Sequence, residues 1–198
     1  MKLDLRFSDR PLENLWCQAV VALVFQGSDL TEGALFGLNK KMAGFLSDLQ
    51  GRGFWTGSRG ENILVASQDA IRAEKILLKG LGESRDFDVE LLVNHIREVG
   101  VTFNKMAIYE FGIHIPVFQG MEEEHASHLE ICARQVANPF FQHHRGEPDF
   151  TLKIIFSVES YTGKVLGPVA GRLREYFGLQ VECSIVLDFE SERESNSI

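Results

Sequence analysis

The chain has 198 residues, a formal net charge of -8 at neutral pH, and 44% hydrophobic against 24% charged residues. A chain of this length buries roughly 70% of the surface it exposes when unfolded, which is enough for one self-sufficient core. The acidic balance argues against a nucleic-acid partner, because proteins that bind phosphate backbones use basic surfaces.

Cysteine usage and the start of the chain favour a soluble cytoplasmic protein. Cys17, Cys132 and Cys183 are odd in number and far apart, as is typical of reduced thiols. The first ten residues carry charges where a signal peptide needs an apolar region. The longest apolar run, Ala19 to Phe25, is far shorter than the ~20 residues that a spanning helix requires.

The first fifty residues predict two strands and a helix. Lys2 to Phe7 alternates apolar and charged residues, which indicates a half-exposed strand, either at an edge of the sheet or appended to it. Ala19 to Phe25 is a continuous apolar run that is typical of a strand buried on both faces. Ser28 or Thr31 can cap a helix that extends to about Leu49.

The middle of the chain predicts a βαβ unit. After a glycine-rich loop over 50–60, strands are expected at 62–66 and 75–78, and the second ends in Gly80-Leu81-Gly82. Asp86 or Asp88 caps a helix with apolar residues at helical spacing, and 106–109 resumes strand character.

The last third predicts two helices and two strands. Helices are expected over 122–137, ending at Asn138-Pro139, and after Pro168 as a first-turn proline; strands are expected over 150–158 and 181–189. Alternating strands and helices indicate a three-layer α/β/α sandwich with a mixed, mostly parallel sheet and its edges at the termini. Residues 1–189 are expected to form one domain, and 190–198 a disordered acidic tail.

The order of these segments resembles the amino-terminal domain of the M17 leucyl aminopeptidases over about Leu15 to Tyr109. The resemblance rests on the run from Val20 to Leu49, the Arg/Gly/Phe loop, and a strand that ends in Gly80-Leu81-Gly82 before an acid-capped helix. It implies a macro-domain-like fold. In that family the peptidase chemistry belongs to a separate carboxyl-terminal domain that holds two metals and includes an Asn-Thr-Asp-Ala-Glu-Gly-Arg segment, which this sequence lacks. The resemblance therefore does not imply aminopeptidase activity here.

The macro-like resemblance implies a phosphate or nucleotide cleft where strands turn into helices. The candidate ligand-binding residues are Gly27, Ser28, Asp29, Gly80, Gly82, Ser160, Tyr161, Thr162 and Gly163. Turns of this kind can direct backbone N–H groups at an anion. The alternative is plain turn geometry, because glycine is common at strand ends.

Two other groups of residues are candidates for a zinc site and for a subunit interface. His125, His128 and Cys132 follow helical spacing and could approach a zinc ion, although ordinary packing also explains them. Phe54, Trp55, Phe140 and Phe141 fall in segments that resemble loops, where they could form a subunit interface or cover the core.

The first functional hypothesis is a non-catalytic, stand-alone relative of the M17 amino-terminal domain, without a cofactor or metal. It would act as an assembly or interaction module, as a homo-oligomer or with a separate M17 catalytic chain. The alternative is a small-ligand binder or hydrolase that takes a nucleotide or an ADP-ribose-like compound in a macro-like cleft.

Overall fold

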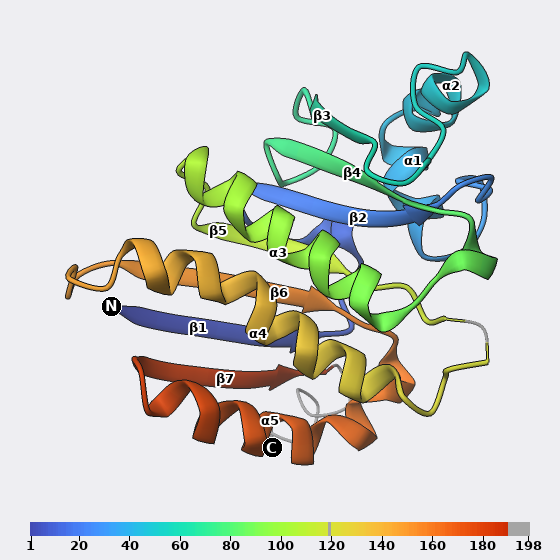
Figure 1. The fold of residues 1–198 in the computed structure, drawn as a ribbon. Coiled ribbons are helices and arrows are strands. Elements are labelled where there is room, and N and C mark those ends of the chain that lie inside the picture. Colours follow the sequence, from blue (N-terminus) through green and yellow to red (C-terminus); the bar gives the residue numbers. More distant parts are fainter. Residues whose placement is uncertain (119, 190–198) are drawn as a thin grey trace, which may run out of the picture.

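The protein is built around one seven-stranded sheet (Figure 1). The computed structural model describes residues 1–118 and 120–189. The strands are β1 (Lys2–Ser8), β2 (Ala19–Phe25), β3 (Asn62–Ala66), β4 (Lys75–Gly82), β5 (Glu110–His114), β6 (Thr151–Ser157) and β7 (Glu182–Asp188). Their order in space is β3-β4-β2-β5-β6-β1-β7, and every neighbouring pair is parallel except β3 and β4.

Helices cover both faces of this sheet and complete three layers (Figure 1). One face carries α3 (Val89–Lys105), α4 (His125–His143) and α5 (Gly163–Gly178), and the other carries α1 (Phe36–Lys41) and α2 (Phe45–Gly51). In β4, Leu77 and Leu81 belong to the first core, whereas Ile76 and Leu78 belong to the second. The predicted α/β/α sandwich is confirmed. Within the described residues, no helix is both long and apolar enough to cross a membrane.

The buried run Ala19–Phe25 forms β2, as predicted, and lies between β4 and β5. Val21 and Leu23 point into one core, and Val20 and Val24 point into the other. Helices cover both faces of β2. Its side chains alternate between the two cores, so residues on both faces of the strand need to be apolar.

The prediction that Lys2 to Phe7 forms an edge strand is wrong, although the strand itself is confirmed. β1 lies between β6 and β7, inside the sheet. Its polar side chains suit this place because the Asp4 carboxylate and the Arg6 guanidinium, 2.8 Å apart, pair with each other. The alternating pattern therefore indicates that one face of the strand is incompletely covered, and it does not indicate that the strand lacks a neighbour on one side.

The single helix expected up to Leu49 is replaced by the short helices α1 and α2. The helical conformation is interrupted between them, where Ala43 has a φ of 53° and Gly44 a φ of 80°. Both values are left-handed backbone conformations, which interrupt a right-handed helix. The strand expected over 106–109 is also displaced, since α3 continues to Lys105 and β5 begins at Glu110.

Helix α4 does not end at Asn138-Pro139 as predicted, but continues through Pro139 to His143. The continuation is stabilised by burial, because Phe140 and Phe141 extend the apolar stripe of Val136 into the core. Pro168 likewise lies inside α5 and not in its first turn, because α5 begins at Gly163.

Helices α3 and α4 approach each other closely at Gly100. A Cβ atom added to Gly100 would lie 2.4 Å from the carbonyl oxygen of Val136. Only a residue without a side chain fits this crossing, so Gly100 sets the distance between the two helices.

Candidate functional site

The parallel strands end together at one edge of the sheet, where open α/β sheets usually bind ligands. Two of the three turns predicted as ligand-binding lie next to each other, because Gln26 donates its backbone N–H to the carbonyl of Gly82 at 2.8 Å. The third, around Ser160, follows β6 and is separated from β2 by β5. Of the nine candidates, Ser28 and Asp29 line the cavity at this edge.

The Gly80 and Gly82 turn is covered by another segment of the same chain. Gly82 donates to the carbonyl of Gly57 at 3.0 Å, and Gly80 donates to the carbonyl of Glu61 at 2.8 Å. A Cβ on Gly80 would lie 2.1 Å from the carbonyl oxygen of Ser58, and Gly82 has a φ of +81°. The expected need for glycine is confirmed, and the group that approaches closely is the loop over 57–61.

The turn after β2 borders a small cavity of about 160 Å³ that is lined by Ser28, Asp29, His114 and Pro116 among others. The Asp29 carboxylate accepts hydrogen bonds from the backbone and hydroxyl of Thr31 at 2.7 and 2.6 Å. The hydrogen bond from the Thr31 hydroxyl has the larger effect and that from the Thr31 backbone the smaller, and together they lower the pKa of Asp29. The charged Asp29 carboxylate thus stabilises the local turn through these hydrogen bonds.

His114, at the end of β5, is a buried residue of this edge that the sequence interpretation missed. Its Nδ1 lies 3.2 Å from the carbonyl oxygen of Ser157, and burial lowers its pKa. The signal was present in the sequence, since His114 ends an apolar strand where ligand-contacting residues commonly lie.

The turn over Ser160–Thr162 is a single 3-10 turn that leads into α5. Tyr161 is exposed, whereas Thr162 is buried, and a Cβ atom added to Gly163 would lie 3.1 Å from the ring of Phe189. None of these four residues lines the cavity beside Ser28.

The zinc alternative is not supported by the described part of the chain. His125, His128 and Cys132 are all buried on α4, but no group of three or more His, Cys, Asp or Glu among the described residues is arranged to hold a metal. Burial raises the pKa of the Cys132 thiol, as expected for a cysteine packed in the core.

Three of the four aromatic residues proposed for an interface lie inside their own chain. Trp55 is 1% exposed, and Phe140 and Phe141 are buried in the core beneath α4. The prediction that these three residues form a subunit interface is wrong, because they are buried within their own chain. Phe54, at 70% exposure, is the one that remains available.

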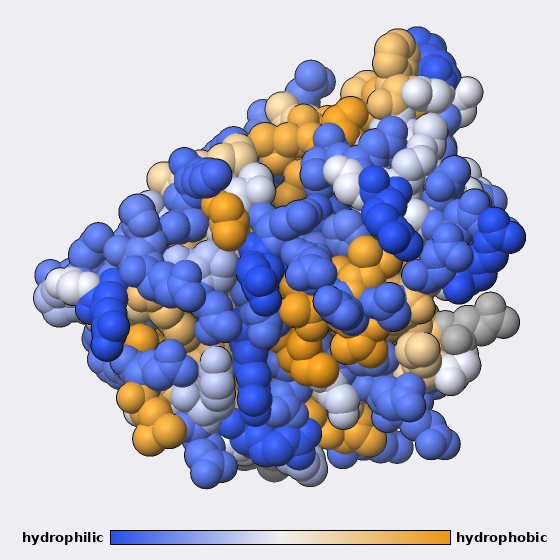
Figure 2. All heavy atoms as spheres, viewed as in Figure 1, coloured by the Kyte–Doolittle hydropathy of each residue, from blue (hydrophilic) through white to orange (hydrophobic). Residues whose placement is uncertain are grey.

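Other large apolar side chains of α1, α2 and β3 are also exposed. Phe36 begins α1, Phe45 begins α2, and Leu64 lies on β3; all are exposed. Figure 2 shows apolar residues gathered at the end of the molecule where Figure 1 places β3, α1 and α2. We call Phe36, Phe45, Phe54 and Leu64 the apolar end.

A groove of about 390 Å³ opens beside the apolar end. It is lined by Lys41, Met42, Ala43, Phe45, Val65, Ala66, Ser67, Gln68 and Ala70. The groove therefore lies between the α1–α2 junction and strand β3.

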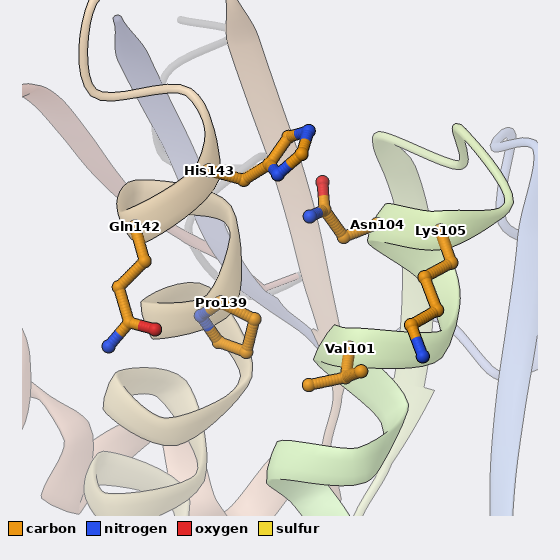
Figure 3. A pocket seen from close by; sticks show the side chains of 6 residues that line it. All are labelled: Val101, Asn104, Lys105, Pro139, Gln142 and His143. Atoms are coloured by element: carbon orange, nitrogen blue, oxygen red, sulfur yellow. The ribbon is translucent and has the colours of Figure 1, made fainter.

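A larger groove of about 550 Å³ separates the carboxyl ends of α3 and α4 (Figure 3). Val101, Asn104 and Lys105 line it from α3, and Pro139, Gln142 and His143 from α4. The basic residues suit the negative ends of the two helix dipoles. Asn104 also bonds within the protein, since its Oδ1 lies 2.9 Å from Nε2 of His144.

Comparison with solved structures defines the class of fold. The chain is similar to a macrodomain mutant from Oceanobacillus iheyensis, with a TM-score of 0.59 and 13% identity over 88% of this chain and 93% of the other. The macrodomain of Mycobacterium tuberculosis DarG gives a TM-score of 0.54 and 13% identity over 77% of this chain and 96% of the other. A mutant of tomato leucine aminopeptidase gives 0.62 and 14% over 88% of this chain, but 35% of that chain. The fold is macrodomain-like.

The family follows from the sequence. Residues 20–145 match the model of the cytosol aminopeptidase family, N-terminal domain, and the chain belongs to that family. It is 25% identical over 116 residues to a probable cytosol aminopeptidase of Trichormus variabilis, which covers 59% of this chain and 24% of the relative. One from Dechloromonas aromatica is 31% identical over 94 residues, 48% of this chain and 19% of the relative. The chain thus aligns with about a quarter or less of these relatives.

Proposed function

We propose that this macrodomain-like chain is an assembly module of the cytosol aminopeptidase family that associates with itself and performs no peptidase chemistry. The observation that carries the proposal is the apolar end: Phe36, Phe45, Phe54 and Leu64 are large, exposed and confined to α1, β3 and the vicinity of α2. Large exposed apolar side chains at one end of a molecule are typical of interaction sites. A separate catalytic chain of the same family is the other partner consistent with the family match.

The family match also favours a non-catalytic role. The matching region is the amino-terminal domain of the family. A two-metal hydrolase needs close-set carboxylates, and the sequence lacks the family's Asn-Thr-Asp-Ala-Glu-Gly-Arg segment. The cytoplasmic location expected from the sequence remains a prediction.

The second candidate is the binding of a nucleotide or ADP-ribose-like compound at the carboxyl edge of the sheet. It is favoured by the cavity that Ser28, Asp29 and His114 line, at the edge where α/β sheets bind ligands. Its volume of about 160 Å³ is small beside the roughly 300–1,000 Å³ of typical ligand pockets. The loop over 57–61 also covers Gly80 and Gly82, so the assembly role is the better supported of the two.

Light scattering of the purified chain tests self-association. We expect an oligomer at about 100 micromolar and a concentration-dependent shift toward monomer on dilution, because an interface of limited area dissociates at low concentration. Phe54→Ser combined with Phe45→Ser should weaken the oligomer, whereas Tyr161→Ser, at an exposed aromatic in the turn between β6 and α5, should not. A monomer at every concentration would refute self-association.

Two further measurements separate the alternatives. The non-catalytic role would be contradicted if the purified chain alone hydrolysed a leucyl amide substrate in the presence of zinc or manganese. A rise in melting temperature with ADP-ribose would favour the second candidate, because a ligand that binds only the folded state stabilises it by mass action.

A further inference from the structure

Strand β3 forms one edge of the sheet and pairs only with β4 among the described strands. The backbone N–H of Ser67 donates to Glu74, and that of Gly80 donates to the carbonyl of Glu61. Residues 61 and 67 therefore turn their backbone groups toward β4, and by antiparallel alternation so do Ile63 and Val65. The N–H and C=O groups of Asn62, Leu64 and Ala66 then face outward.

This edge lacks the features that normally prevent strands from pairing across molecules. Its sequence, Asn62 to Ala66, contains neither a charge nor a proline, and Leu64 is 42% exposed. The opposite edge differs, because β7 begins at Glu182 and ends at Asp188, with Glu182 paired to Lys2. Natural sheets usually protect free edges with charges or prolines, so an apolar unprotected edge indicates a pairing surface.

The strand is complementary to itself in an antiparallel arrangement centred on Leu64. Leu64 then lies opposite its own copy, Ile63 lies opposite Val65, and Asn62 lies opposite Ala66. The three outward residues of each strand could exchange about six backbone hydrogen bonds across the symmetry axis. Just outside the strand, Glu61 would face Ser67, so no like charges are opposed.

The groove beside β3 adds apolar contact on one face of such a pair. Ile63 and Val65 point toward the core under α1 and α2, where Val65 also lines the groove with Met42 and Phe45. A second copy would place its Ile63 beside Val65, at this groove. Side-chain burial is needed in addition to the backbone bonds, because a five-residue strand alone covers less than the roughly 1,000 Å² of a stable interface.

We propose that two copies of this chain join through β3, antiparallel and centred on Leu64, so that their sheets become continuous across a two-fold axis. The proposal rests on the self-association proposed above and names the strand that mediates it. A two-fold contact of this kind uses the same patch on both subunits, as self-complementary interfaces do.

A charge-swap experiment tests this register. Leu64→Lys and Leu64→Glu each place like charges opposite one another at the axis, and each variant alone should be monomeric where the unchanged protein is dimeric. An equimolar mixture of the two should form a heterodimer, because unlike charges then face each other. Leu179→Lys and Leu179→Glu, at an 87% exposed position far from β3, are matched controls that should leave the dimer unchanged.

Light scattering gives the masses, and circular dichroism shows that each variant is folded. Recovery of the dimer only on mixing supports pairing at Leu64, since misfolded variants would not be rescued. A dimer that neither charge disturbs overturns the β3 proposal and leaves the assembly role standing. A monomeric unchanged protein overturns both, and a strand supplied by a different protein is then the remaining occupant of this edge.

Discussion

The ammonium Nζ of Lys79 on β4 lies 2.6 Å from Oε2 of Glu98 on α3, and the two partners differ sharply in exposure. The Lys79 side chain is 2% exposed, whereas that of Glu98 is 62% exposed. Nζ also donates to Oδ1 of Asn62 at 3.1 Å, so the cation links α3, β4 and the edge strand β3. A buried cation depends on such partners because it has lost most of its water.

The first prediction concerns this asymmetry. Glu98→Gln should lower the free energy of unfolding by about 1–3 kcal/mol, because it leaves a buried cation without its counter-charge. Lys79→Met should change it by less than about 1 kcal/mol, since the carboxylate that remains is in solvent. Denaturant titration measures both, with Lys75→Met as the control for an exposed pair with Glu74. Equal losses for the two main variants would contradict the explanation.

The second prediction concerns the crossing of α3 and α4. Gly100→Ala should destabilise the protein by roughly 1–3 kcal/mol despite the better helix propensity of alanine, because its Cβ would overlap the Val136 carbonyl. Gly171→Ala on α5 meets no atom within 4 Å and should stabilise by up to about 1 kcal/mol. Thermal unfolding of the pair is the measurement. If both changes stabilise, the helices can separate without cost.

The third prediction concerns the end of β4. Gly80→Ala should destabilise by at least about 2 kcal/mol, because the new Cβ meets the rigid backbone at Ser58. Gly51→Ala, at the end of α2 with open space around it, is the matched control and should be close to neutral. Urea denaturation distinguishes them, and a stable Gly80→Ala protein would mean that the loop over 57–61 moves away easily.

The fourth prediction is a loss of stability in mild acid. Burial, followed by the charges that His114 and His128 would carry, lowers the pKa of His125 to about 4 from its ordinary 6.5. The unfolded state therefore binds more protons between these two values, so this contribution is complete above about pH 6.5 and is lost as the pH falls toward about 4. The loss is at most about 3 kcal/mol.

Unfolding titrations at about pH 7.5 and pH 5 test the fourth prediction, because this interval lies above the ordinary carboxylate pKa of about 4. His125→Gln should flatten the dependence, and His143→Gln, an exposed histidine on the same helix, should leave it unchanged. The lowered pKa values of His95, His114 and His128 should keep some slope in the His125 variant. An unchanged slope after His125→Gln would contradict the assignment.

The amino-acid sequence by itself determined the class of fold and most of the elements. The run Ala19–Phe25 and the segment Asn62–Ala66 were predicted with the observed bounds, because burial on two faces and neighbouring turns leave a clear local pattern. Asp88 was among the expected caps of α3, and its carboxylate accepts the N–H of Leu91 at 2.6 Å. The family resemblance and the glycine requirement at Gly82 were also visible in the sequence.

Only the tertiary structure decided where strands lie in the sheet and which side chains remain exposed. The sequence pattern of β1 could not reveal that β6 and β7 flank it, because both partners are more than a hundred residues away. Local propensity ended α4 at Pro139, whereas burial of Phe140 and Phe141 carries it further. Trp55 and Phe54 are neighbours in sequence, yet one is in the core and the other in solvent. Exposure depends on long-range packing, and so does the position of β3 at the edge of the sheet that the described strands form.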